Sequence, residues 1–191
     1  MINKKFWRGK RVFLTGHTGF KGGWLSLLLY SLGVKVRGYS LKPPTTPSLF
    51  KEAKINLVID SKIGDIRDHD KLYKNMVDFN PDILIHMAAQ PIVRYSYLNP
   101  IETYETNVIG TAKVFEVAKS CNNLEAIINI TTDKCYENDG RSRGYKEDDP
   151  IGGYDPYSSS KSAAELVTSA YRRSFFKKQS ISLASVRAGN V

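Results

Sequence analysis

The sequence lacks the features that mark secreted, membrane and metal-binding proteins. It contains two cysteines, Cys121 and Cys135, which cannot build a disulfide framework, and their spacing matches no metal site. No run approaches the roughly 18 consecutive apolar residues that a membrane span needs. The positively charged residues 1–7 are not followed by the apolar core of a signal peptide. These absences favour a protein of the reducing cytoplasm.

Charge is not concentrated in one segment. Lys and Arg number 28 against 19 Asp and Glu, a formal net charge of +9, but they are scattered, with short clusters at residues 4–5 and 172–178. A nucleic-acid-binding protein would gather them on one face, so we expect no nucleic-acid partner. A doubly negative diphosphate substrate would account for part of the excess. With 41% hydrophobic residues and no internal repeat, the 191 residues suit one domain with a real core.

Strand and helix patterns alternate along the chain. Strands alternating with helices of this length imply right-handed crossovers and a parallel sheet covered on both faces. The predicted fold is therefore α/β, a Rossmann-type doubly wound parallel sheet in three α/β/α layers. Strands are predicted at residues 11–16, 34–39, 61–66, 82–87, 124–131 and 181–187, and helices at residues 21–32 (amphipathic), 68–79, 99–120 and 157–176.

The first predicted strand leads into a glycine-rich turn, T-G-H-T-G-F-K-G at residues 15–22, and then into a helix. This order is what a dinucleotide pyrophosphate site needs. Gly16 permits the tight turn, Gly19 lets the backbone approach the phosphates, and Gly22 lets helix and strand pack closely. The helix N-terminus then offers free N–H groups to the anion. The turn therefore predicts dinucleotide binding.

A second pattern, Tyr-x-x-x-Lys, lies in the predicted helix 157–176. Its four-residue spacing places Tyr157 and Lys161 on one face. A lysine cation beside a phenol favours the phenolate and lowers a pKa that is otherwise about 10. Such a tyrosine can take a proton from a substrate hydroxyl. An exposed helix pair would have the same spacing, and it is the combination with the glycine turn that favours a catalytic role.

Polar residues follow the predicted strand 124–131 directly. Thr132 can hydrogen-bond a substrate oxygen, Asp133 can act as a general acid, and Lys134 adds an amine. An ordinary turn would also contain such residues. In a doubly wound sheet, however, ligands bind beyond the carboxyl ends of the strands. That position favours a catalytic reading of the segment.

Together these motifs resemble the extended short-chain dehydrogenase/reductase superfamily, and within it the sugar 4,6-dehydratases of the cytidine branch, which act on CDP-glucose. The resemblance covers all 191 residues. The segments that carry it are TGHTGFKGGW at residues 15–24, GDIRD at 64–68, HMAAQPIVR at 86–94, TTDKCY at 131–136, GGYDPYSSSK at 152–161 and RAGNV at 187–191.

The resemblance implies a redox-neutral dehydration with tightly held NAD, in deoxysugar biosynthesis. Tyr157, aided by Lys161, would remove the C4 hydroxyl proton. Thr132 would polarise the C4 oxygen, and Asp133 would protonate the departing C6 oxygen. The product would be a 4-keto-6-deoxy sugar. The implied NAD contacts are Gly16, Thr18, Gly19, Phe20, Lys21, Gly22, Ser40, Asp65, Ile66, Ala88, Ala89, Gln90, Asn107, Thr131, Tyr157 and Lys161, and Asn190 is expected near the sugar diphosphate.

Two positions depart from the common pattern of the superfamily. Many sugar-nucleotide dehydratases have a glutamate after the aspartate as the C5 base, whereas this chain has Lys134. A lysine can serve only if burial or a nearby cation makes its neutral form accessible, and Glu137 is a rival base. The acidic residue that usually binds the ribose is also missing. Ser40 can bind a ribose hydroxyl, while Lys42 would tolerate a 2′-phosphate, so NAD is favoured through the resemblance alone.

Three further expectations follow from the resemblance. Its members continue into a C-terminal substrate domain, so residues 1–191 are expected to be an NAD-binding domain, a fragment of a longer protein. Helices 99–120 and 157–176 are expected to form a homodimer interface. The alternatives are a nucleotide-sugar 4-epimerase, which needs no acid such as Asp133, and a non-catalytic NAD-binding fragment. The apolar stripes expected at the interface contain Val108, Val114, Val117, Ala163, Leu166 and Val167.

Overall fold

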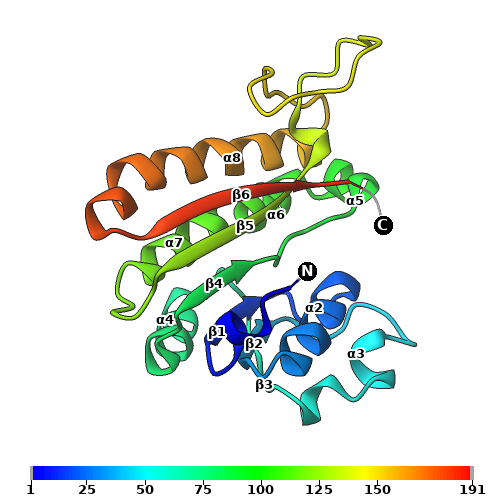
Figure 1. Ribbon diagram of the computed structural model, residues 1–191. Coiled ribbons are helices and arrows are strands. Elements are labelled where there is room, and N and C mark those ends of the chain that lie inside the picture. Colours follow the sequence, from blue (N-terminus) through cyan, green and yellow to red (C-terminus); the bar gives the residue numbers. More distant parts are fainter. Residues whose placement is uncertain (1, 190–191) are drawn as a thin grey trace.

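A computed structural model describes residues 2–189, and its centre is one six-stranded parallel sheet (Figure 1). The strand order is β3-β2-β1-β4-β5-β6, so the chain starts in the middle of the sheet and winds outward in both directions. This confirms the predicted doubly wound topology. The strands are β1 (Arg11–Thr15), β2 (Lys35–Ser40), β3 (Asp60–Ile63), β4 (Ile83–His86), β5 (Ala126–Thr132) and β6 (Ser182–Ala188).

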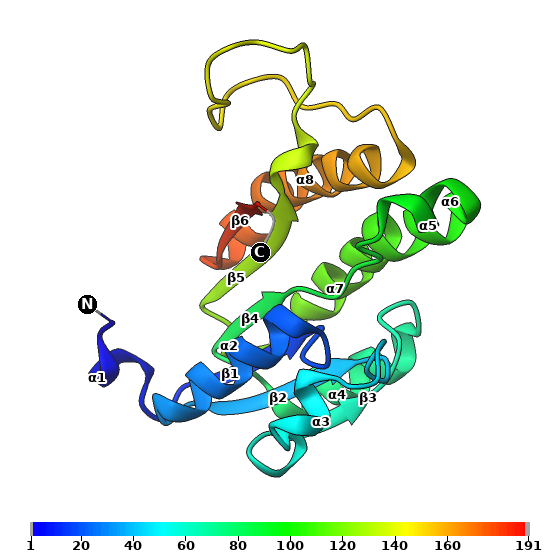
Figure 2. The same cartoon turned by 90° about the vertical axis from the view of Figure 1, so that its right-hand side faces the viewer.

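Helices cover both faces of the sheet (Figure 2). One face packs against α4, α7 and α8, and the other against α2, α3 and a 3-10 turn. The longer helices are α2 (Phe20–Ser31), α4 (His69–Phe79), α7 (Gly110–Ala118) and α8 (Pro156–Ser174). The short ones are α1 (Lys4–Trp7), α3 (Leu49–Glu52), α5 (Val93–Leu98) and α6 (Pro100–Tyr104), with a π turn η2 (Glu105–Ile109) and 3-10 turns η1 (Ile55–Leu57), η3 (Asp133–Cys135) and η4 (Phe176–Gln179).

The alternation of side chains along β1 explains the two cores. Val12 and Leu14 point into one hydrophobic cluster, with Leu29 of α2, while Phe13 points into the other, with Met76 of α4. All three strand residues are fully buried. A central parallel strand buries both of its faces and therefore shows a continuous apolar run rather than an alternating one.

The helix boundaries follow local capping chemistry. Asp155 caps α8, accepting hydrogen bonds from the N–H groups of Tyr157 and Ser158, and Pro156 occupies the first turn. Asp68 caps α4 in the same way, and Asn80 ends it in the left-handed conformation. The predicted helix 99–120 is one helical run in three parts, α6, the π turn and α7, because the π turn shifts the hydrogen-bond register.

The predicted amphipathic helix at residues 21–32 forms as α2, but several of its large apolar residues are exposed. Trp24 and Leu28 are 55% and 43% exposed, whereas the side facing the sheet contains Gly22, Gly23 and Ser26. A Cβ on Gly22 would overlap the Gly16 carbonyl oxygen of the glycine turn, and a Cβ on Gly23 would press against Leu49 of α3 and Ile55 of η1. The buried side of α2 therefore combines these small residues with Leu29, whereas Trp24 and Leu28 lie on the exposed side.

The expected dimer stripe also needs correction. Val114 and Val117 are 0% and 1% exposed and pack in the core beneath α7, so they face their own sheet. Leu166 is 61% exposed, and Ile101 on α6 is 70% exposed. The apolar surface of these helices thus keeps Leu166 from the expected stripe, loses Val114 and Val117 to the core, and adds Ile101.

Within residues 2–189, no helix is both long and apolar enough to span a membrane.

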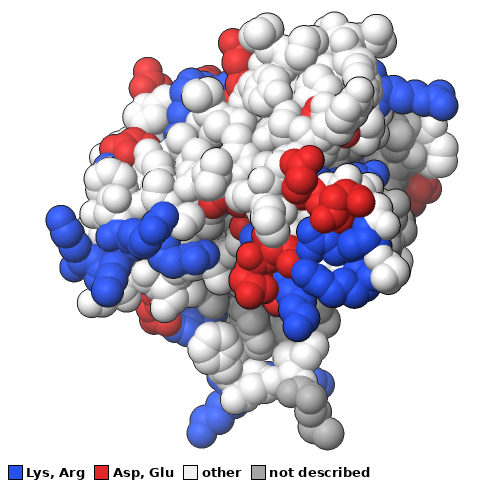
Figure 3. All heavy atoms as spheres, turned by 90° about the horizontal axis from the view of Figure 1, so that it is seen from above, with Lys and Arg blue, Asp and Glu red and all other residues white. Residues whose placement is uncertain are grey.

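Charge of both signs lies on the face drawn in Figure 3, where one group of side chains is basic and another region alternates acidic and basic side chains.

Candidate active site

The carboxyl ends of the strands meet at one edge of the sheet. The register pairs Thr15 of β1 with Tyr39 of β2 and with His86 of β4, and it pairs Thr132 of β5 with Ala188 of β6. The glycine turn, the segment after β4 and the segment after β5 therefore open at the same edge. This is the edge at which doubly wound sheets bind ligands.

The glycine turn leaves no room for larger side chains at two of its three glycines. Gly16 has φ +80°, and a Cβ there would lie 2.8 Å from the Ala88 nitrogen. A Cβ on Gly22 would overlap the carbonyl oxygen of Gly16. Gly19 differs, because a Cβ there would meet only that same oxygen, at 3.5 Å, and its position as N-cap of α2 has no side-chain cap. The first turn of α2 contains no acidic residue, so its N-terminus suits an anion.

Two predicted cofactor residues, Thr18 and Ser40, contact each other. Their hydroxyl oxygens lie 2.8 Å apart, and the Thr18 hydroxyl donates to the Leu41 carbonyl at 2.8 Å. Because Thr18 has a single hydroxyl proton, Ser40 must be the donor in the bond between them. Ser40 is left with free lone pairs, which can accept a hydrogen bond from a ribose hydroxyl but not from a phosphate.

Beneath the glycine turn, buried side chains form a chain of hydrogen bonds in which each residue donates to the next. The Thr15 hydroxyl oxygen accepts from the backbone N–H groups of Met87 and Ala88 at 3.0 and 3.1 Å, so its proton goes to His86 Nδ1, 2.7 Å away. The Thr111 hydroxyl donates to the Asn107 carbonyl, so it must accept from His86 Nε2 at 3.1 Å. Both ends require the same neutral tautomer, with the proton on Nε2.

Burial agrees with that assignment. His86 is 2% exposed, and burial, followed by the charge of Lys161, lowers its pKa to about 3. The sequence analysis missed Thr15 and His86 as site residues. The signal was present, since each is a polar residue at the end of an otherwise apolar strand.

Asn107 extends this chain to the helix of the Tyr-x-x-x-Lys pattern. Its amide exchanges two hydrogen bonds with the backbone of Gln90, at 2.8 and 3.0 Å, and donates to the Ser160 hydroxyl at 2.9 Å. Asn107 is 2% exposed. The Gln90 side chain itself is used in the local turn, where it accepts from Ile92 N–H and donates to Thr103. Asn107 therefore holds the backbone of Gln90, and with it the segment after β4, at the carboxyl edge of the sheet.

The other predicted cofactor residues differ in their exposure and in the contacts that they already make. Asp65 forms a two-pronged ion pair with Arg67, and although burial opposes it, this pair lowers the carboxyl pKa. Ile66 is buried at 3% exposure. Phe20 is exposed, and Lys21 donates to the Gly189 carbonyl at 3.1 Å. Ala88 and Ala89 are half-buried at the end of β4, and Asn190 lies outside the described residues.

Tyr157 and Lys161 lie at the same edge, at 8% exposure each. Burial raises the pKa of Tyr157, the carboxylates of Asp133 and Asp155 raise it further, and only the hydrogen bond with Thr132 acts in the opposite direction. The expected lowering by Lys161 is therefore not found. Lys161 is itself buried, which lowers its own pKa to about 8, so its ammonium group loses its proton more readily.

Thr132 is buried, whereas Asp133 and Lys134 are exposed. Thr132 begins the 3-10 turn η3 and accepts from the backbone N–H of Lys134 at 3.3 Å. Asp133, Lys134 and Glu137 line a cavity of about 1270 Å³ between η3, β6 and α8. Within the described residues, Lys134 is thus exposed in this cavity and not buried.

The strand order and the flanking helices are those of the Rossmann-like fold of the short-chain dehydrogenases. A family model described as GDP-mannose 4,6 dehydratase matches residues 13–185, and the chain belongs to this family. Within the extended short-chain dehydrogenase/reductase superfamily, the chain is homologous to the NAD-dependent nucleotide-sugar 4,6-dehydratases.

Among its relatives is the CDP-glucose 4,6-dehydratase of Salmonella typhimurium, 57% identical over 196 residues that cover 100% of this chain and 55% of that protein. The chain thus spans about half the length of this relative. Two solved structures share the fold. The UDP-glucose 4-epimerase of Brucella ovis in complex with NAD has a TM-score of 0.80 at 22% identity, with 95% of this chain and 52% of that one covered. The dTDP-glucose 4,6-dehydratase of Streptomyces venezuelae with NAD bound has a TM-score of 0.78 at 23% identity, covering 93% and 54%.

Proposed function

We propose that the full-length protein converts CDP-glucose to CDP-4-keto-6-deoxyglucose with catalytic NAD, and that residues 1–191 are its NAD-binding domain. The observation that supports this most directly is that Thr132, the last residue of β5, hydrogen-bonds Tyr157 at the start of α8, with the Asp133 carboxylate close enough to act on the same phenol. The 57% identity to a CDP-glucose 4,6-dehydratase supports the choice of substrate.

NAD fits the residues at the edge of the sheet. The uncapped N-terminus of α2 and the close-packed glycine turn form a cradle for a pyrophosphate. Ser40 offers an acceptor to a ribose hydroxyl, which favours NAD over a cofactor with a 2′-phosphate. When bound there, NAD supplies the oxidation of C4 and the later reduction of C6.

The residues of the chain supply the proton transfers. Tyr157 takes the proton of the C4 hydroxyl, and Thr132 donates a hydrogen bond to the C4 oxygen. Once C4 is a ketone, the proton on C5 becomes acidic. Asp133 protonates the C6 oxygen as water leaves. Lys134 and Glu137 line the cavity beside Asp133 and are the two candidate bases for the C5 proton.

Incubation of the full-length protein with CDP-glucose and NAD tests the proposal. We expect formation of the 4-keto-6-deoxy product, detected by its absorbance in alkali, together with release of one water per sugar by mass spectrometry. A product of unchanged mass with inverted C4 would instead identify a 4-epimerase, and no turnover would contradict both enzymes.

The substitution Asp133→Asn separates dehydratase from epimerase chemistry. An amide retains the shape of the carboxyl group but cannot deliver an acidic proton. We expect C4 to be oxidised while water is lost about 10²–10⁴-fold more slowly, the usual effect of removing a general acid. A 4-keto sugar that retains its C6 hydroxyl should then accumulate, as measured by quenching with borodeuteride and mass spectrometry. Product formation at the parent rate would exclude Asp133 as the acid.

We also propose a homodimer through the surface of α6, the π turn and α8. Ile101, Ile109 and Leu166 on these elements are 70%, 52% and 61% exposed. Burying them against a second copy would remove apolar area from water. Sedimentation of the full-length protein should give a dimer that Leu166→Glu weakens, with the exposed Leu57→Glu, on η1, as control. A monomer at high micromolar concentration would contradict this proposal.

The free, buried thiols of Cys121 and Cys135 suit a cytoplasmic location.

A further inference from the structure

A loop separates the two catalytic segments of the chain. After Tyr136 the chain leaves the body of the domain and returns at Ile151, and Figures 1 and 2 show this segment projecting beyond the end of α8. At its base, Tyr136 and Ile151 form an antiparallel bridge. Glu137 N–H donates to Pro150 and Gly152 N–H donates to Cys135, each at 2.9 Å. The loop, residues 137–150, is thus anchored directly beside the 3-10 turn that holds Asp133 and Lys134.

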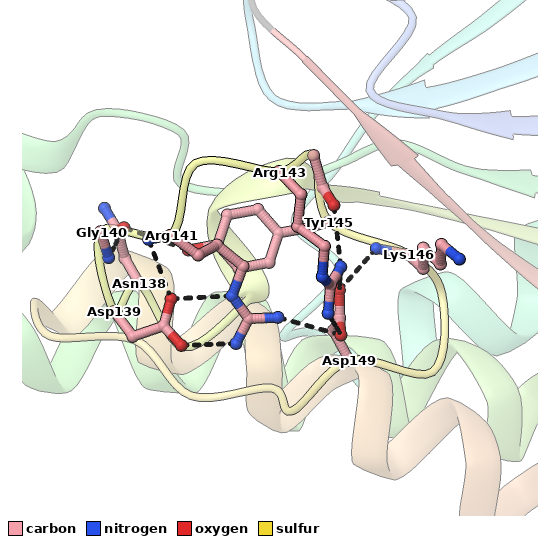
Figure 4. A network of polar contacts seen from close by, with 9 residues as sticks. Asn138, Asp139, Gly140, Arg141, Arg143, Tyr145, Lys146 and Asp149 are labelled. Carbon is pink, nitrogen blue, oxygen red and sulfur yellow. Dashed lines mark hydrogen bonds and ion pairs between the residues drawn. The ribbon is translucent and has the colours of Figure 1, made fainter.

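Ion pairs hold the inside of the loop together (Figure 4). Asp149, with a side chain only 10% exposed, binds Arg141 at 3.0 Å and Arg143 at 2.6 Å, and accepts from the Lys146 N–H at 2.7 Å. Arg141 also pairs with Asp139 at 2.6 Å. These bonds close the loop on itself, but they do not attach it to the domain.

A stack of four side chains makes that attachment. The rings of Tyr136 and Tyr145 are parallel within 17° with centroids 4.9 Å apart. The Arg141 guanidinium lies over Tyr145 at 4.8 Å, on the loop side, and the Arg187 guanidinium lies over Tyr136 at 4.8 Å. Arg187 belongs to β6, so the stack runs from the sheet into the loop. Cation–π contacts of this kind are favourable and become stronger when the cation is partly desolvated.

Arg187 is held on both of its sides. It pairs with Glu165 of α8 at 3.2 Å and donates to the Glu147 carbonyl in the loop at 3.0 Å. Glu165 is 7% exposed and also accepts from the hydroxyls of Thr131 on β5 and Ser185 on β6. Burial alone would raise the pKa of Glu165, but these hydrogen bonds and Arg187 hold it below its ordinary value. A charged Glu165 therefore fixes the orientation of Arg187.

We propose that Arg187 is a positioning residue, which clamps Tyr136 and the loop 137–150 against the end of β5 so that the loop forms a fixed wall of the cavity around Asp133 and Lys134. The proposal rests on the proposed function for its effect on catalysis. The cavity supports it directly, since Tyr136, Tyr145, Glu147 and Arg187 line the same space as Asp133 and Lys134. A wall that moves by about 1 Å would lower the rate of the step that depends on it by up to about 100-fold.

Limited trypsin digestion of the full-length protein tests the clamp without reference to activity. The loop contains three trypsin sites, after Arg141, Arg143 and Lys146. We expect Arg187→Gln to speed cleavage at these sites about tenfold, because the open form of the loop becomes more populated. Arg173→Gln is the matched control, since Arg173 is exposed and bonds only within its own helix. Cleavage of Arg187→Gln at the parent rate would overturn the proposal.

Tyr145→Leu provides a second variant that leaves the pair of Arg187 and Glu165 intact. Its side chain lies in the loop and its loss should not affect folding of the sheet, so it decides the question if Arg187→Gln does not fold. We expect the same faster cleavage, and an unchanged rate would again overturn the clamp.

Steady-state kinetics then separate positioning from a merely structural role. For Arg187→Gln and Tyr145→Leu we expect kcat to fall about 10- to 100-fold, with NAD affinity unchanged, because neither residue is among the predicted NAD contacts. Faster cleavage of the loop with an unchanged kcat would overturn the positioning role. If the parent protein does not dehydrate CDP-glucose, the proposed function fails by itself, and the cleavage rates still decide whether Arg187 holds the loop.

Discussion

The cofactor side and the substrate side of the candidate site are built in different ways. The cofactor side rests on Thr15, His86 and Asn107, all within 2% exposure, linked by hydrogen bonds that run in one direction. On the substrate side, Asp133 and Lys134 are exposed, and the neighbouring loop is held by ion pairs and stacked rings.

This difference separates a rigid part of the site from an adjustable one. Buried hydrogen bonds are costly to break because each freed group would remain without a partner. Surface ion pairs are weak and are screened by salt. The cofactor side is therefore preformed, whereas the substrate side depends on a few contacts, of which those of Arg187 bridge the sheet and the loop.

The largest expected effect comes from the residue at which the two sides meet. Tyr157→Phe in the full-length enzyme removes the group that accepts the C4 proton, and we expect kcat to fall about 10²–10⁴-fold. NAD affinity, measured by calorimetry, should change little by comparison, since the ring still fills its buried place at 8% exposure. Near-normal turnover would leave Tyr157 as a buried packing residue of α8 without a catalytic role.

The glycine turn allows the cofactor side to be broken in two distinguishable ways. A Cβ at Gly19 would meet only the Gly16 oxygen, at 3.5 Å, so we expect Gly19→Val to fold but to fill the space expected for the pyrophosphate. We expect NAD binding to weaken by at least about 100-fold, as measured by calorimetry, the size of effect expected when a close backbone approach is lost. Gly22→Val should instead fail to fold, because its Cβ would overlap Gly16. Unchanged NAD affinity in folded Gly19→Val would contradict this assignment.

Mild acid should weaken the cofactor side first. Burial lowers the pKa of His17 to about 4 and that of His86 to about 3, from 6.5. The unfolded chain binds these protons near pH 6.5 and the folded chain does not, so stability is greatest above pH 6.5 and falls as pH drops towards the folded values. At pH 5 each histidine should have lowered the free energy of unfolding by roughly 2 kcal/mol.

Denaturant unfolding at pH 7.5 and pH 5 measures this loss. The carboxyl groups of Asp65 and Glu165 have lowered pKa values, from 3.8 and 4.5, so their contributions persist through this range and are lost only in stronger acid. His17→Gln should reduce the loss, because one of the two titrating groups is removed. Equal stability of the parent protein at both pH values would contradict the burial of the histidines.

The sequence predicted the helices and strands well, but it did not predict which side chains of a helix face the sheet. The six strands, the four long helical segments and the topology are confirmed, because apolar periods, capping residues and glycines act locally. In the predicted amphipathic helix 21–32, Trp24 and Leu28 are exposed, while close packing at Gly22 and Gly23 leaves no room there for larger side chains. In the predicted dimer stripe, Val114 and Val117 were wrong and Leu166 is exposed as expected, because helical spacing does not say which side of a helix meets the sheet.

The amino-acid sequence by itself determined the doubly wound fold and the family, because both depend on motifs of a few neighbouring residues. Only the tertiary structure decided the tautomer of His86, the hydroxyl that donates between Thr18 and Ser40, and the contact of Arg187 with Tyr136. Each of these joins residues that are far apart in the chain. Such contacts depend on which strands become neighbours, and that order is set when the whole sheet packs.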